Sequence, residues 1–175
     1  MANNIKQVDN VNGSKMNLGQ IEIAAIRGVE QGLTQLKMLD VKTQSDTAAE
    51  SLSAEDAGKL IVIPNVGQDS VYSLPTPDIG LHYHIVGFGA LAADGHDVSF
   101  HTATLNTDFF HGALVHHDTN QTGQTTTVVY GDGDSNDKIK LDIPQFFDIH
   151  FLCKTTASWY VWGHTASDTI VTIGD

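Results

Sequence analysis

The sequence predicts a mainly β protein: an antiparallel β-sandwich or barrel, jelly-roll-like, with an extended or partly helical N-terminal arm. After residue 58, about ten short runs rich in Thr, Val, Ile and aromatic residues follow one another at roughly 8 to 12 residue spacing, as in all-β domains. The run Leu81–Ala90 alternates with period two, which is the period of a strand. All thirteen aromatic residues lie between Tyr72 and Trp162, so the core is expected there.

Each predicted strand is a compact apolar or alternating run bounded by turn residues. The ten runs are Lys59–Pro64, Val71–Leu74, Leu81–Ala90, Val98–Leu105, Gly112–His116, Thr125–Tyr130, Lys138–Ile143, Phe147–Lys154, Ser158–Gly163 and Thr169–Ile173. Asp94-Gly95 is a hairpin signal. Ahead of the first strand, Ser53 precedes Ala54, Glu55 and Asp56, which predicts a short helical turn that Gly58 ends.

The chain divides into an N-terminal arm, residues 1–50, and a β body, residues 51–175. The arm has no aromatic residue, and residues 1–15 are polar and Asn-rich, which predicts an extended segment. Between residues 18 and 40, apolar residues recur at three- and four-residue steps, as on an amphipathic helix. The pairs Ile21/Ile23 and Leu39/Val41 alternate instead, so helix and strand both stay open here.

The charge excludes several classes of partner. Nine basic residues stand against twenty-one acidic ones, a formal net charge of -12. Such a chain repels phosphate backbones and anionic membrane surfaces, so we expect no nucleic acid and no membrane as partner. No apolar run approaches the roughly 18 to 20 residues of a spanning helix, and the first residues carry no secretory signal. The single cysteine, Cys153, lies in an apolar run and is predicted to be a buried, inert thiol.

Histidine is the most suggestive residue type for chemistry. His82 and His84, separated by one residue, would lie on one face of a strand about 7 Å apart, as in the metal-binding pair of the cupin family. The cupin pattern needs a Glu a few residues later, and no Glu follows Glu55. His116 and His117 are consecutive, so on a strand they point to opposite faces. We therefore expect no metal site.

Asp132–Asp137 resembles the opening of a calcium-binding loop. The EF-hand pattern requires Gly and Glu where this chain has Asp137 and Ile143, so a polar turn between strands is the prediction, with a weak cation site left open. No nucleophile elbow or phosphate-binding loop is present, so we expect no enzyme, no catalytic residues and no cofactor. Trp159 alternates with Tyr160, which predicts a core strand with one packed aromatic face, and a sugar-binding surface is the alternative.

Four pieces of the body carry a family resemblance: SLSAEDAGKLIVIP, VYSLPTPDIGLHYHIVG, FFHGALVH and KIKLDIPQFFDIHFLCKTTASWYVWGHT. Their motifs occupy Leu52 to Lys59, Leu74 to Tyr83, His111-Gly112 and Trp159 to Gly163, and Ser158 stands where Asn is common. In this order the pieces resemble a family of small virion proteins of tailed bacteriophages, common in marine phages. The resemblance covers residues 51 to 165.

The resemblance implies a viral structural protein, a capsid decoration or cement protein on the outer surface of the virion. Its implied partners are the major capsid protein and neighbouring copies of itself in a symmetric oligomer such as a homotrimer. The alternative is a receptor- or glycan-binding knob or fibre component, which predicts that Trp, Tyr and His side chains cluster exposed on one rim. A cupin-type metal enzyme and a non-viral binding module are the remaining hypotheses.

Overall fold

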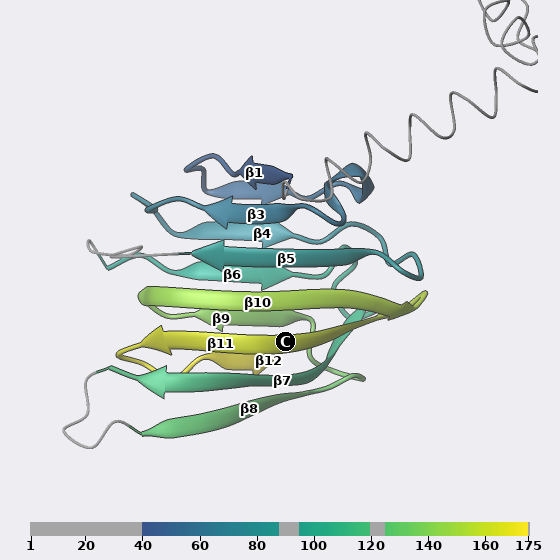
Figure 1. The fold of residues 1–175 in the computed structure, drawn as a ribbon. Helices are drawn as coiled ribbons and strands as arrows, with labels where there is room; N and C mark the ends of the chain where they lie inside the picture. Colours follow the sequence, from purple (N-terminus) through teal and green to yellow (C-terminus); the bar gives the residue numbers. More distant parts are fainter. Residues whose placement is uncertain (1–39, 88–94, 120–124, 175) are drawn as a thin grey trace, which may run out of the picture. The chain divides into compact units, whose positions relative to one another are not determined.

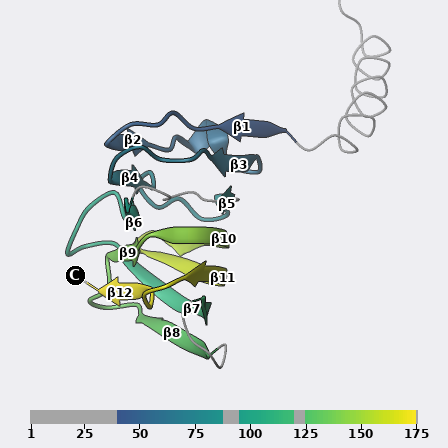
Figure 2. The same cartoon turned by 90° about the vertical axis from the view of Figure 1, so that its left-hand side faces the viewer.

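Two β-sheets face each other in the computed structural model, which describes residues 40–87, 95–119 and 125–174 (Figures 1 and 2). The seven-stranded sheet has the order β1 (Val41–Thr43), β3 (Leu60–Ile63), β5 (His82–Gly87), β10 (Pro144–Thr155), β11 (Ser158–Ser167), β7 (Phe109–Asp118) and β8 (Thr126–Asp132). The five-stranded sheet has the order β12 (Thr172–Gly174), β9 (Lys138–Leu141), β6 (Val98–His101), β4 (Ser70–Ser73) and β2 (Ala49–Ser51). The mainly β fold is confirmed in its sandwich form. Each of the ten predicted runs overlaps one of the strands β3 to β12.

The first six strands alternate between the two sheets. β1, β3 and β5 are parallel neighbours in the large sheet, and β2, β4 and β6 are parallel neighbours in the small one. A chain that crosses to the other sheet and back returns in its original direction, so its next strand lies parallel to the one before. Five of the ten pairings among the described residues are parallel, so the prediction of an antiparallel sandwich is corrected to a mixed one.

Consecutive strands pair directly at only two places in the described chain, β7 with β8 and β10 with β11. The predicted hairpin at Asp94-Gly95 is wrong, because β5 and β6 on its two sides belong to different sheets. Asp94 itself lies outside the described residues. Gly95 has φ +87°, the left-handed conformation that favours glycine, and it lies between strands that do not pair with each other.

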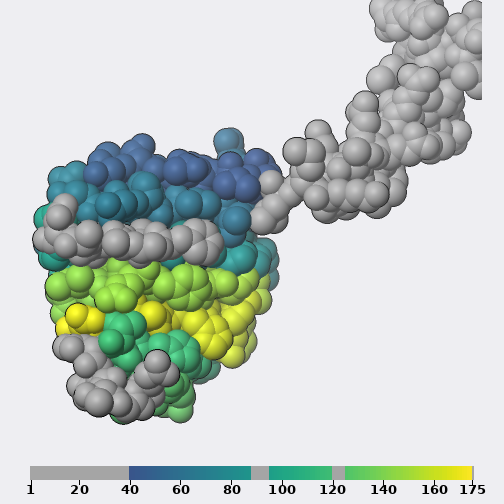
Figure 3. All heavy atoms as spheres, turned by 60° about the vertical axis from the view of Figure 1, so that its left-hand side comes forward, coloured from purple at the N-terminus to yellow at the C-terminus, as the bar shows by residue number. Residues whose placement is uncertain are grey.

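The strand β1 lies in the segment predicted as arm, and β2 begins there and ends at Ser51, the first residue of the predicted body. Val41 of β1 pairs with Leu60 of β3, and Glu50 of β2 pairs with Tyr72 of β4, so residues from 41 onward contribute to the two sheets. Of residues 18–40, where helix and strand stayed open, all but Asp40 lie outside the described residues. In Figure 3 the blue segment that contains β1, the light green segment that contains β10 and the yellow segment that contains β11 lie in that order across the molecule, as in the large sheet.

The core lies between the sheets and is rich in aromatic rings. Phe100 of the small sheet contacts Phe147 and Phe151 of the large one, with ring centroids 5.8 and 5.3 Å apart. Trp159 lies against Tyr83, at 5.7 Å, and is fully buried. Burying one such side chain contributes about 1.5–3 kcal/mol, so this layer stabilises the sandwich.

The inert, buried thiol predicted at Cys153 is confirmed in its burial. The side chain lies in the core, and burial raises the pKa of the thiol. The Sγ atom also donates a hydrogen bond to the carbonyl oxygen of Thr155, at 3.1 Å. A thiol that is protonated and shielded from solvent is a poor nucleophile.

The short turn predicted before the first body strand is the 3-10 helix η1 (Ala54–Asp56), and Gly58 follows it with φ +81°. Asp56 is buried, and its Oδ2 atom accepts hydrogen bonds from the backbone N–H and hydroxyl of Ser53, at 3.0 and 2.9 Å. Lys42 of β1 lies 2.9 Å and Lys59 3.3 Å from the same carboxylate. Burial acts to raise the pKa of Asp56, but these hydrogen bonds outweigh it and hold the pKa well below its usual range. None of the described helices is long and apolar enough to cross a membrane.

Candidate functional site

The large sheet turns one face away from the small sheet, and we call it the outer face. Strand register aligns the residues of this face into rows that cross the sheet. The central row consists of Val41, Leu60, His84, His150, Trp162, Ala113 and Tyr130. The row on one side contains Val86, Asp148, His164, Val115 and Val128, and the row on the other contains His82, Leu152, Tyr160, His111 and Asp132.

Aromatic side chains are exposed on this face. Tyr130 is 70%, Tyr160 40% and Trp162 36% exposed, and these are the exposed Tyr and Trp residues of the described chain. The corresponding row on the outside of the small sheet has another character: Thr172, Lys140, Ser99, Val71 and Ala49. The two outward surfaces of the sandwich are therefore chemically different, and the aromatic one belongs to the large sheet.

Trp159 and its neighbours follow the predicted alternation. Trp159 packs in the core with Val161, and Tyr160 and Trp162 lie on the outer face. Trp, Tyr and His side chains cluster on this face of the sheet. The glycan- or receptor-binding alternative predicts such a cluster of exposed side chains, but at a rim of the domain.

Three histidine rings stack beside Trp162. His150 lies parallel to Trp162 with centroids 4.9 Å apart, and His84 stacks on His150 at 4.0 Å. His82 joins the group, and its Nε2 atom lies 3.1 Å from Nδ1 of His150. Burial, together with the neighbouring His84, lowers the pKa of both His82 and His150, which favours neutral rings.

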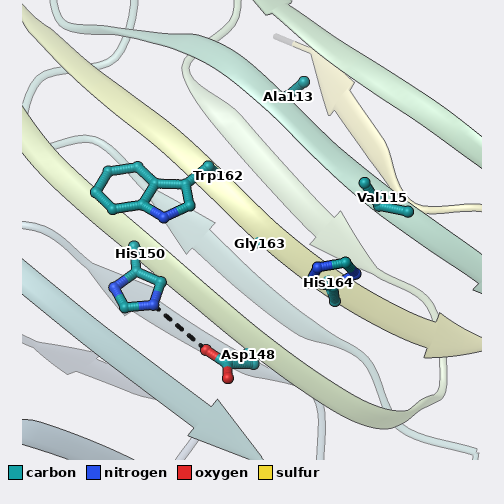
Figure 4. Close-up of a pocket in the computed structure, with 7 residues that line it drawn as sticks. All are labelled: Ala113, Val115, Asp148, His150, Trp162, Gly163 and His164. Atoms are coloured by element: carbon teal, nitrogen blue, oxygen red, sulfur yellow. Dashed lines mark ion pairs between the residues drawn. The ribbon is translucent and has the colours of Figure 1, made fainter.

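Asp148 completes this cluster. Its Oδ1 atom lies 2.8 Å from Nε2 of His84 and 3.6 Å from Nε2 of His150, the second contact being the dashed line in Figure 4. His84, Asp148 and His150 can each offer a ligand atom such that all three lie within 4.8 Å of one another. Sequence reasoning paired His84 with His82 along one strand and missed the Asp-x-His pattern of β10, which supplies the other two groups.

A hollow of about 410 Å³ opens next to the cluster (Figure 4). Its lining residues are Ala113, Val115, Asp148, His150, Trp162, Gly163 and His164. Small residues make the space: Ala113 stands in the central row between the large rings of Trp162 and Tyr130. Gly163 has φ +150°, and a Cβ there would collide with the carbonyl oxygen of Asp148. No other residue type fits that position without moving β10.

His116 and His117 point to opposite faces, as predicted. His116 is buried, and its Nδ1 lies 3.2 Å from the hydroxyl of Thr165. His117 is exposed on the outer face and stacks on His164 with centroids 5.6 Å apart. The two adjacent histidines therefore cannot bind one ion together.

The segment Asp132–Asp137 forms the predicted polar turn. The carboxylate of Asp132 accepts hydrogen bonds from the backbone N–H groups of Asp134 and Ser135 and from the Ser135 hydroxyl. These bonds lower the pKa of Asp132 to about 2. Asp137 is buried and accepts a hydrogen bond from the backbone N–H of Asn106, at 2.7 Å. The carboxylates of Asp132 and Asp137 are thus occupied by hydrogen bonds within the fold.

Compared with known protein families and with curated proteins, the chain finds no match in either.

Proposed function

We propose that the chain is a structural protein of a bacteriophage virion, a decoration or cement protein on the outer surface of the capsid. In this proposal the β body binds the major capsid protein and neighbouring copies of itself, as a homotrimer or similar symmetric oligomer. Two things support it: the resemblance of residues 51 to 165 to small virion proteins, and the outer face of the large sheet.

The observation that carries the proposal is the set of exposed aromatic rings on a rigid sheet. Tyr and Trp are enriched in protein interfaces and often contribute most of the binding free energy. The three rows of the outer face contain no Lys or Arg, whose desolvation would oppose burial. Tyr160 and Trp162 lie on β11 and Tyr130 on β8, with only β7 between them, so a flat protein partner can cover all three at once.

Rebinding to phage heads tests this function. Heads of the phage whose genome encodes the chain are stripped of the protein and titrated with the purified full chain, and bound copies are counted after sedimentation. We expect saturable binding of hundreds of copies per head. Tyr130→Ser and Tyr160→Ser should weaken binding by about tenfold or more, since interface Tyr residues often act as hot spots. Lys140→Ser, on the outside of the small sheet, is the matched control and should bind as wild type. Absence of the chain from purified virions would refute the proposal.

A second candidate function, glycan or receptor binding by a knob or fibre component, is favoured by Trp162. Its exposed ring borders the hollow, and a flat apolar ring beside polar groups suits the face of a sugar. Titration with host surface polysaccharide, followed by the fluorescence of Trp162, tests this alternative. The glycan-binding function requires a saturable change in fluorescence that Trp162→Phe reduces. It also requires that each virion carry tens of copies of the chain rather than hundreds.

A further inference from the structure

We propose that His84, Asp148 and His150 form a binding site for one divalent transition-metal ion, with Zn²⁺ as the best fit, on the outer face of the large sheet. The site joins strands β5 and β10, and it is independent of which partner the outer face binds.

The donor set argues for a transition metal. Two imidazoles and one carboxylate suit Zn²⁺, Cu²⁺, Ni²⁺ or Fe²⁺, whereas Ca²⁺ and Mg²⁺ prefer oxygen ligands alone. A set of two His and one acidic residue is also the ligand set of open zinc sites, which keep one position for water or another ligand. Asp148 supplies the negative charge that a cluster of neutral histidines lacks.

The backbone geometry already places the three side chains together. His84 and His150 are direct partners in the register of β5 and β10, and such cross-strand pairs have Cβ atoms about 4.5–5.5 Å apart. Asp148 lies two residues from His150 on the same face. Ligand atoms around a tetrahedral Zn²⁺, with bonds of about 2.0–2.2 Å, lie roughly 3.3–3.5 Å from one another. Asp148 Oδ1 lies 2.8 and 3.6 Å from the two Nε2 atoms, so side-chain rotations suffice to admit the ion.

Neighbouring groups orient His150 for this role. Nδ1 of His150 lies 3.1 Å from Nε2 of His82. In the tautomer in which the Nδ1–H of His150 donates a hydrogen bond to His82, Nε2 of His150 keeps its lone pair, and that atom faces Asp148. Metal-binding histidines usually donate their other ring N–H to a neighbouring acceptor, and Nε2 of His82 stands where that acceptor would be. Trp162, parallel to His150, restricts the plane of the same ring.

The hollow gives the ion an accessible fourth position. Asp148 and His150 both line it, and the small side chain of Ala113 leaves it open. A water molecule, or an oxygen or nitrogen donor from a bound partner, can complete the coordination there. The His84 and His150 rings now lie nearly parallel, at 14°, so binding should separate them and change the surroundings of Trp162.

Calorimetric titration of the chelator-treated full chain with ZnCl₂ tests the proposal. We expect one Zn²⁺ per chain, with a dissociation constant in the micromolar range or below. Asp148→Asn and His150→Gln should each weaken binding by about tenfold or more, since each removes a ligand. The matched control is His117→Gln, which removes an exposed histidine of the same face that stacks on His164 rather than on the cluster. Far-UV circular dichroism verifies that every variant is folded.

A second readout uses Trp162. Cu²⁺ bound at the cluster should quench the fluorescence of Trp162, and Asp148→Asn should abolish this saturable quenching. The proposal is overturned if wild type binds no Zn²⁺ up to millimolar concentration, if Asp148→Asn binds as tightly as wild type, or if His117→Gln loses binding to the same extent as His150→Gln.

Discussion

Asp56 is a buried carboxylate that links the 3-10 helix η1 to β1 through Lys42, and Asp56→Asn tests how much these contacts stabilise the fold. The change keeps the shape of the side chain but replaces Oδ2, or Oδ1, by an NH₂ group that cannot accept hydrogen bonds. Hydrogen bonds to a charged group contribute about 1.5–3 kcal/mol each, and those from the Ser53 N–H and hydroxyl are the two concerned. Lys42 and Lys59 are 31% and 28% exposed, so water can replace their contacts, and each adds only about 0.2–1 kcal/mol. Both Ser53 bonds go to Oδ2, and an Asn amide oxygen can still accept them as neutral hydrogen bonds of about 0.5–1.5 kcal/mol each. The two bonds together then lose about 2–3 kcal/mol, and with the lysine contacts we expect a loss of about 2–5 kcal/mol in the free energy of unfolding at pH 7.

The effect should depend on pH in a defined direction. The pKa of Asp56 in the folded chain is held below its value in the unfolded chain, about 3.9. The unfolded state therefore binds more protons at acid pH, and the contribution of Asp56 is complete above about pH 5 and is lost as pH falls through the unfolded pKa toward the folded pKa. Wild type should lose more stability than Asp56→Asn between pH 7 and pH 3.

Urea unfolding followed by circular dichroism measures both quantities. Glu55→Gln, the exposed neighbour that carries the same charge, is the control and should change the free energy of unfolding by less than about 0.5 kcal/mol. The reasoning fails if Asp56→Asn is no less stable than Glu55→Gln at pH 7, or if wild type and Asp56→Asn lose the same stability on acidification.

Two further predictions concern β11. Gly163→Ala should destabilise the chain by about 3 kcal/mol or prevent folding, because the added Cβ collides with the carbonyl oxygen of Asp148. The control Gly58→Ala, whose Cβ meets open space, should cost only about 1 kcal/mol. Thermal unfolding measures both variants, and equal losses of stability would contradict the packing argument. Trp162→Phe should leave only the fluorescence of Trp159, which is buried. The emission of this variant should lie at shorter wavelength than that of wild type and should resist quenching by iodide. Strong iodide quenching of the variant would show that Trp159 is at the surface instead.

Strand positions could be predicted from the sequence because alternation and β-branched residues act locally. β1 and β2 could not, since VKT and AES are too short to show a period, and their pairing with β3 and β4 stabilises them. The parallel pairings could not be predicted either, because a run such as Lys59–Pro64 indicates a strand but not which strand pairs with it or in which direction. The Asp94-Gly95 signal predicted a hairpin, and the prediction was wrong because the pairing of the strands beside it depends on the topology and not on the turn residues.

Only part of the candidate site could be predicted from the sequence. His82 and His84 share a face because of their spacing, and the sequence shows that directly. Asp148 and His150 have the same spacing on another strand, but nothing local indicates that β10 lies beside β5. Exposure of Trp162 escaped prediction for a related reason, since alternation separates the two faces of β11 without telling which of them a second sheet covers.

The winding of the first six strands between two sheets has a consequence for folding. Within the described residues only two pairings join consecutive strands, and His84 contacts Asp148 across 64 residues of chain. Loops of that length must close before the central strands can pair, and such long-range closure slows folding. The histidine–aspartate cluster should therefore assemble late, after the two hairpins, and a peptide cut from β5 or β10 alone would hold only a fragment of it. The formation of the ring stack around Trp162 would then report the moment at which the two sheets are complete.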